Sequence, residues 1–287
     1  MNSNTYFNQI MALPGLDEMK EILMQWDRAA NNISRMPTDT PIVLPDLLWS
    51  TRSGAGKTHL IKLLTEYLYS KRLMDFYGDT KYFEFLLEYC PPNTHLNELT
   101  RLIREVNAAA GFRSEYRGVL ALDISLWNNH FEELYFQRIL EYLSSVDDYI
   151  CIIFIAENFS NEDMIKVENI LSSFFRIRRV NLHYPSVSQL ADYLEHKLST
   201  YGLKLQNDAK ILLEESIHEL VDNRFFDGYK TINRMCQDIV FDLCSAEDFS
   251  PINITVEKLS RFSKDGEFVK SMKEIIKTRK MGFGGNV

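Results

Sequence analysis

The apolar residues of this chain follow two different patterns, one up to about residue 185 and another after it. In the first part, short apolar runs alternate with segments whose apolar residues have helical spacing. Two runs, Gly118–Ile124 and Ile150–Ala156, are apolar almost throughout, which is typical of strands buried on both faces of a parallel sheet. Three more strands are predicted at Ile42–Trp49, Lys81–Tyr89 and Ile177–His183. This alternation predicts an α/β domain with a five-stranded parallel sheet.

Helices are predicted around these strands, whereas residues 1–15 are polar and then irregular in pattern. Pro45 is expected at the start of the first strand or in a bulge, because proline cannot donate a hydrogen bond to a sheet. Apolar residues at helical spacing predict helices over about 16–26, 60–71, 93–111, 131–146 and 160–175.

The strand patterns stop after Pro185. Ser186-x-x-Gln189 is a capping box that begins a helix ending at Tyr201, and Gly202 follows as a C-terminal glycine. We therefore expect two domains, an α/β domain over residues 1–185 and an all-helical domain over 186–287. Within the second domain, further helices are predicted at about 207–223, 229–245, 255–262 and 266–278.

The clearest chemistry lies in the glycine-rich stretch SGAGKT at 53–58, between the first strand and a helix. Its glycines let successive backbone N–H groups face one anion, and the helix adds its positive N-terminal end. Lys57 is expected to reach the β- and γ-phosphates of a nucleotide, and Thr58 to place its hydroxyl on Mg²⁺. The full pattern has a glycine where this chain has Thr51, so a turn that merely caps a helix is the alternative. The candidate nucleotide-binding residues are Ser53, Gly54, Ala55, Gly56, Lys57, Thr58 and His59.

Asp123 ends a buried strand two elements after this loop. An aspartate there can hold the Mg²⁺ of a bound nucleotide, directly or through water. A helix cap or a turn residue is the structural alternative. We expect a magnesium site formed by Thr58 and Asp123.

Taken in order, these motifs resemble those of the AAA+ ATPases over nearly the whole chain. Residues 13–20, LPGLDEMK, are similar to the GLD-x-x-K segment of the branch that contains red-type rubisco activase and sporulation stage V protein K. Residues 53–58 match the end of the Walker A motif, and 119–123 match Walker B. Residues 228–234, GYKTINR, are similar to the sensor 2 segment, and the tail at 280–284 resembles a short IGFG ending.

The resemblance also implies roles for single residues. Asn158 follows the fourth strand, where the family has its sensor 1 residue. Arg176 ends the segment SSFFR, where the family has SRF, and is implied as the arginine finger, with Arg178 or Arg179 as alternatives. The residues that the sensor 2 segment implies near the γ-phosphate are Lys230 and Arg234.

For the whole protein, the resemblance implies a P-loop sheet domain followed by a small helical lid. It implies ATP and Mg²⁺ as cofactors, and ATP hydrolysis that remodels a protein partner. The active molecule would be a homo- or hetero-oligomeric ring, since the family shares each active site between neighbouring subunits. The implied catalytic residues are Lys57, Asp123, Asn158 and Arg176.

The chain departs from the family at the residue after Asp123, where a glutamate usually polarises the attacking water and this chain has Ile124. Base catalysis contributes about 10²–10⁴-fold, so slow hydrolysis is expected, and Ile124→Glu is expected to raise turnover if the rest of the site is intact. Glu157 is a candidate substitute because it ends the neighbouring strand, and a solvated loop acid is the alternative. If another carboxylate takes this role, the candidates are Glu132 and Glu133.

A second departure concerns the segment Cys90–Asn93, which lacks the aromatic-apolar-glycine pore loop of members that thread polypeptides. This argues against threading of a polypeptide through a ring.

The chain has 287 residues, of which 45% are hydrophobic, and a formal net charge of −8. This composition supports a large core, and the acidic balance does not favour nucleic-acid binding. The N-terminus has no basic start followed by an apolar block, and the longest apolar run, Ile150–Ala156, is too short to span a bilayer. A cytoplasmic protein without a membrane partner is expected.

Two other functions fit the same loop. A nucleotide-sensing or structural subunit would bind ATP, hydrolyse little and act beside an active partner, and Ile124 favours this interpretation. A small-molecule kinase is the other alternative. The helical C-terminal domain with Lys230 and Arg234 argues against a kinase, because such kinases usually have an arginine-rich lid within the α/β domain.

Overall fold

The computed structural model describes residues 4–33, 35, 43–74, 82–87, 118–128, 130–145, 150–223, 226–246 and 254–279. The predicted helix at 93–111, the segment Cys90–Asn93 and the tail at 280–284 lie outside the described residues. The chain divides into two compact units. The first comprises Met1–Arg52 and Lys57–His183, and the second comprises Ser53–Gly56 and Tyr184–Val287.

A five-stranded sheet forms the centre of the first unit, and its strand pairs are all parallel. The strands lie in the order β2-β3-β4-β1-β5. Parallel neighbours need crossover connections, which place helices on the faces of the sheet. The predicted five-stranded parallel sheet is thereby confirmed. The strands are β1 (Asp46–Thr51), β2 (Tyr82–Leu86), β3 (Gly118–Asp123), β4 (Ile150–Glu157) and β5 (Ile177–Asn181).

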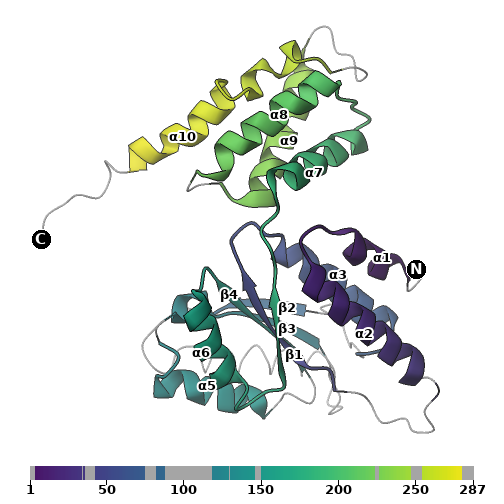
Figure 1. The fold of residues 1–287 in the computed structure, drawn as a ribbon, viewed down its shortest axis with the longest axis vertical. Helices are drawn as coiled ribbons and strands as arrows, with labels where there is room; N and C mark the ends of the chain where they lie inside the picture. Colours follow the sequence, from purple (N-terminus) through teal and green to yellow (C-terminus); the bar gives the residue numbers. More distant parts are fainter. Residues whose placement is uncertain are drawn as a thin grey trace, which may run out of the picture. The chain divides into compact units, whose positions relative to one another are not determined.

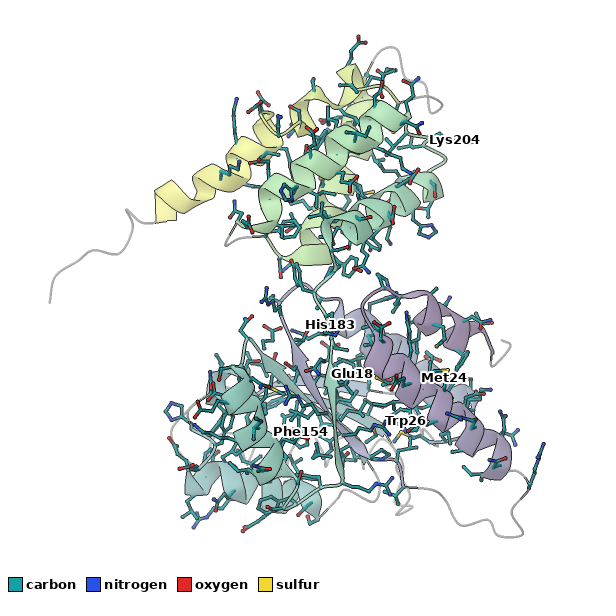
Figure 2. The ribbon with its side chains drawn as sticks, in the orientation of Figure 1. Glu18, Met24, Trp26, Phe154, His183 and Lys204 are labelled. Atoms are coloured by element: carbon teal, nitrogen blue, oxygen red, sulfur yellow. The ribbon has the colours of Figure 1, made fainter. Side chains whose placement is uncertain are left out.

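Helices cover both faces of this sheet, α1, α2 and α3 on one side and α5 and α6 on the other (Figure 1). An apolar cluster fills each layer. Figure 2 labels Trp26, which belongs to the cluster under α2 and α3, and Phe154, which belongs to the cluster under α5 and α6. The helices are α1 (Asn4–Ala12), α2 (Asp17–Ile33), α3 (Lys57–Ser70), α5 (Leu134–Ser144) and α6 (Asn161–Leu171), and a short 3-10 helix, η1, spans Ser125–Trp127.

Two local features differ from the sequence predictions. Residues expected to be irregular form α1, because Ile10 and its apolar neighbours at helical spacing pack into the first cluster. The first strand begins at Asp46 rather than at Ile42, directly after Pro45, because a proline has no N–H for the ladder.

The segment GLDEMK joins the start of α2 to the end of β5. Gly15 has a φ of +69° and its carbonyl accepts a hydrogen bond of 3.2 Å from the His183 N–H. Glu18 accepts two more, from the backbone N–H of Asn181 at 2.7 Å and from its side-chain amide at 2.8 Å. Figure 2 labels Glu18 and His183 within the first unit. The segment therefore fixes α2 against the edge strand β5.

The described residues of the second unit form helices and an isolated bridge between Leu205 and Ile254. Ser186 Oγ accepts from the Gln189 N–H at 3.2 Å and the Gln189 side chain accepts from the Ser186 N–H at 2.8 Å, which confirms the predicted capping box. The inward faces of these helices form a third apolar cluster. They are α7 (Val187–Thr200), α8 (Asn207–Val221), α9 (Gly228–Ser245), η3 (Glu257–Phe262) and α10 (Glu267–Arg279).

Across the residues that the structure describes, no helix combines the length and the apolar character needed to cross a membrane.

Candidate nucleotide-binding site

The glycine-rich loop connects a strand to a helix, as the sequence predicts. β1 ends at Thr51 and α3 begins at Lys57. Gly54 and Gly56 have φ values of +77° and +84°, a backbone conformation in which a residue with a Cβ is strained. Because a 14-residue helix starts directly after the loop, its N-terminal N–H groups and dipole favour a bound anion.

Carboxylates contact both side chains that end the loop. Lys57 Nζ forms an ion pair with Glu157 Oε1 at the end of β4. The two side chains are only 17% and 19% exposed, so water screens this pair less than it would a surface pair. Thr58 Oγ1 donates a hydrogen bond of 3.0 Å to Glu84 Oε2 in β2. The cation and the hydroxyl expected to bind phosphate and metal are therefore both held by acids of the first unit.

Asp123, the expected magnesium ligand, is oriented by the serine two residues after it. Its Oδ1 accepts hydrogen bonds from the Ser125 N–H, at 3.0 Å, and from the Ser125 hydroxyl. Ser125 Oγ in turn accepts from the Glu157 N–H at 2.9 Å. One serine thus links the carboxyl ends of β3 and β4, the edge at which the side chains of parallel strands meet.

Asn158 lies directly after β4 in the left-handed backbone region, with a φ of +59°. Its N–H donates to the carbonyl of Thr51 at 2.9 Å, where β1 ends and the loop begins. Asparagine tolerates this conformation better than most residues with a Cβ. The predicted sensor residue is therefore exposed and anchored by its backbone beside the start of the loop.

Ile124 is fully buried in the apolar cluster under α5 and α6, on the sheet face opposite α3. Its N–H donates to the carbonyl of Ile155 at 2.9 Å, which extends the ladder of β3 and β4. Trp127 and Phe131 belong to the same cluster. The side chain at this position is thus part of the core.

This burial changes the expected effect of Ile124→Glu. The substitution places a carboxylate without a partner in an apolar cluster, so we expect it to lower the free energy of unfolding by about 3–5 kcal/mol rather than to raise turnover. Urea unfolding of Ile124→Glu and Ile124→Leu measures the effect. Ile124→Leu keeps the side-chain volume and should cost less than about 1.5 kcal/mol. A Glu variant as stable as the Leu variant would show that the carboxylate reaches water.

The loop residues Ser53–Gly56 belong to the second unit, where they pack on the segment that begins α9. Ser53 Oγ donates to Asp227 Oδ1 at 2.7 Å, and the Tyr229 N–H donates to the carbonyl of Gly54 at 3.1 Å. A side chain at position 54 would run into the backbone of Asp227. Gly54 is therefore required both by its positive φ and by this close approach.

Tyr229 adds an aromatic ring beside the second glycine of the loop. A Cβ at Gly56 would lie 3.3 Å from Tyr229 Cδ2, and the ring packs against that of Tyr193 with centroids 4.7 Å apart. Burial, and to a smaller extent Tyr193, raises the pKa of Tyr229 to about 12. The phenol, like that of an ordinary tyrosine, is neutral at physiological pH and does not repel an anion at the loop.

No protein-family model matches the chain, and no curated protein is significantly similar to it in sequence. Among solved structures, it is similar to the RuvB Holliday junction branch migration motor of Thermotoga maritima, with 17% identity and a TM-score of 0.53 over 94% of this chain and 77% of the motor. Two variants of that motor give TM-scores of 0.54 at 16% and 17% identity, over 94% of this chain and 79% and 78% of theirs. The chain has the AAA+ fold. At these identities the similarity shows a shared fold alone.

In this AAA+ fold, three arginines are candidates for the finger. Arg178 donates to Gln25 of α2 at 2.6 Å, and Arg179 donates to Asn161 of α6 at 3.1 Å. Both are half-buried and connect elements of their own unit. Arg176 is exposed and donates to the carbonyl of Val43 at 3.1 Å. Its geometry is the most compatible with a guanidinium that turns toward another molecule.

The remaining predicted residues belong to both units. Lys230 Nζ lies 3.6 Å from Asp227 Oδ2, with 85% of its side chain exposed, and can move without disturbing the core. Arg234 is exposed one helical turn further along α9. Ala55 lies between the two glycines, and His59 is exposed in the first turn of α3.

Sequence reasoning missed three residues that contact this site, Glu84, Ser125 and Asp227. Ser125 follows Asp123 closely enough to be found as a turn residue. Glu84 and Asp227 carry no local signal of their contacts with Thr58 and Ser53, because these residues lie 26 and 174 positions away in the chain.

Proposed function

We propose that this chain is an ATP-binding AAA+ protein that hydrolyses ATP slowly and uses the cycle to remodel a protein partner. The proposal rests above all on the loop of positive-φ glycines that enters α3, with Lys57 and Thr58 each beside a carboxylate. We further propose that it is related to the branch of red-type rubisco activase and sporulation stage V protein K, because residues 13–20 resemble the entry segment of that branch. We propose a protein rather than a nucleic-acid partner, because the net charge is −8.

The residues at the loop fit a nucleotide with Mg²⁺. Mg²⁺ prefers oxygen ligands and is commonly bound through one or two carboxylates together with substrate phosphates. Thr58 and Asp123 would supply such oxygens, and Lys57 the positive charge. When bound, the metal neutralises charge that develops on the phosphates. Asn158, Lys230 and Arg234 would face the terminal phosphate.

Lys57 must exchange partners when a nucleotide binds. It pairs with Glu157, and a phosphate competes with that carboxylate for the ammonium group. Glu157 would then turn from a counter-charge into a general base at the carboxyl edge of the sheet. There it can accept a proton from water, the role that Ile124 cannot perform because it is apolar and buried.

Glu157→Gln separates these two roles. We expect ATP to bind more tightly, because an anion that competes for Lys57 is removed, while turnover falls about 10²-fold or more. Calorimetry measures the first effect and phosphate release the second. Tighter binding with unchanged turnover would mean that Glu157 is a counter-charge alone and that the catalytic base lies elsewhere.

We also propose that the active form is an oligomeric ring in which Arg176 reaches a neighbour's nucleotide, and that it works in the cytoplasm. The decisive experiment combines calorimetric ATP titration, steady-state phosphate release and light scattering with and without ATP. The proposal predicts binding, weak turnover and nucleotide-promoted assembly. Binding and assembly without turnover would instead support the nucleotide-sensing subunit. A protein that binds no nucleotide would overturn both.

A further inference from the structure

The hydrogen bond between Thr58 and Glu84 joins the loop to a strand that the nucleotide-binding motifs do not include. Thr58 is the second residue of α3, and Glu84 is the central residue of β2 at the edge of the sheet. The hydroxyl Oγ1 lies 3.0 Å from the carboxylate Oε2. A carboxylate can only accept in this bond, so the threonine proton points to Glu84 and the hydroxyl lone pairs point elsewhere.

The strand register explains why this side chain reaches the loop. Glu84 pairs with Ala121 of β3, and Ala121 belongs to the apolar cluster under α3. Phe83 and Phe85, its neighbours in β2, pack against the cluster on the other face. Because side chains alternate along a strand, the phenylalanines face the core under α5 and α6 and Glu84 faces α3.

The same alternation relates Glu84 to the expected magnesium ligand. Leu86 pairs with Asp123 at the ends of the two strands, and Glu84 pairs with Ala121 two residues earlier in each strand. Asp123, Ala121 and Glu84 therefore face the same side of the sheet. An exposed acid on an edge strand is ordinarily solvated, but this one is directed at the hydroxyl expected to bind Mg²⁺.

We infer that Glu84 is a positioning residue for the metal, holding the Thr58 hydroxyl so that its oxygen lone pairs are presented to the Mg²⁺ of a bound nucleotide. The inference rests on the proposed function of the loop. Groups that orient a metal ligand through a hydrogen bond raise the ligand's basicity, and their loss costs about 10–100-fold in metal affinity. The negative charge of Glu84 adds attraction for the cation and repulsion for the nucleotide phosphates.

These two effects have opposite signs, which makes the inference testable by binding alone. ADP affinity is measured by calorimetry in Mg²⁺ and in EDTA, and Mn²⁺ affinity of the protein–ADP complex is measured by electron paramagnetic resonance. For Glu84→Ala we expect metal affinity to fall about 10–100-fold while ADP binds equally well or more tightly in EDTA. Glu84→Gln retains an acceptor oxygen without the charge, so its metal affinity should lie between those of wild type and Glu84→Ala.

Glu21→Gln is the matched control, since it removes the same charge from an exposed position on α2 in the same unit. It should leave metal and nucleotide affinity unchanged. Metal affinity in Glu84→Ala equal to that of wild type would overturn the inference and leave the proposed function intact. A wild-type protein that binds no ADP in either buffer would overturn both. A Glu84→Ala variant that loses ADP binding in EDTA as well would show a structural role and also count against the inference.

Discussion

Lys57→Ala is expected to lower ATP affinity at least about 100-fold, equivalent to about 2.7 kcal/mol, while the fold persists. Hydrogen bonds between an ammonium group and a phosphate are charge-assisted and stronger than neutral ones. The substitution has a second effect because Lys57 is paired with Glu157. With Lys57 absent, Glu157 stays in the site as an unpaired carboxylate that repels the phosphates. Calorimetry with ATP measures the loss, and far-ultraviolet circular dichroism checks the fold.

Two further variants make this result specific. Lys62→Ala removes an equal charge from an exposed position of the same helix and should bind ATP as wild type does. The double variant Lys57→Ala/Glu157→Gln should regain part of the lost affinity, because the repelling charge is gone. A folded Lys57→Ala protein with wild-type affinity would exclude the loop as the phosphate site. If the double variant binds ATP no more tightly than Lys57→Ala, repulsion by Glu157 contributes little to the loss of affinity.

Arg176→Ala should lower the ATP turnover number about 10³-fold or more with little change in ATP affinity. An arginine finger supplies positive charge to the transition state from outside the site, and its contribution is about 10³–10⁵-fold. Arg176 is the exposed candidate, whereas Arg178 and Arg179 donate to Gln25 and Asn161 of their own unit. Phosphate release at saturating ATP measures the effect. Arg178→Ala and Arg179→Ala are expected to lower stability more than turnover.

Mixing two inactive variants tests whether Arg176 acts on a neighbouring subunit. Arg176→Ala subunits keep an intact nucleotide site, and Lys57→Ala subunits keep an intact Arg176. Where the Arg176 of a Lys57→Ala subunit reaches the nucleotide site of an Arg176→Ala subunit, one complete site forms. The mixture should therefore turn over ATP although neither variant does so alone. A mixture as inactive as its components would show that Arg176 acts within its own chain or does not act on ATP.

The parallel sheet could be predicted because strands buried on both faces are apolar at nearly every position, as in β3 and β4. The capping box at Ser186 could be predicted because its two hydrogen bonds join residues three apart. The glycines of the loop belong to the same class of local signals, since their positive φ values follow from the chain turning between β1 and α3.

The contacts around the loop could not be predicted in this way. Glu84 meets Thr58 only because β2 and β3 are paired in one particular register, and sequence spacing does not encode that register. The motif predicts that position 124 faces the nucleotide. Its burial follows from the cluster formed with Trp127 and Phe131, two residues that the motif does not contain. The sequence does not predict α1, because a single short amphipathic helix rich in polar residues resembles an irregular segment.

The core position of Ile124 also restricts how this protein can evolve. Selection for faster ATP turnover would act most directly by introducing a carboxylate at residue 124. Here that substitution buries a charge in the cluster that contains Trp127 and Phe131. The variant would unfold and be degraded before any faster hydrolysis could be selected. Acceleration would have to come from side chains already at the carboxyl edge of the sheet. The slow hydrolysis proposed above is then a property that single substitutions at residue 124 cannot readily reverse.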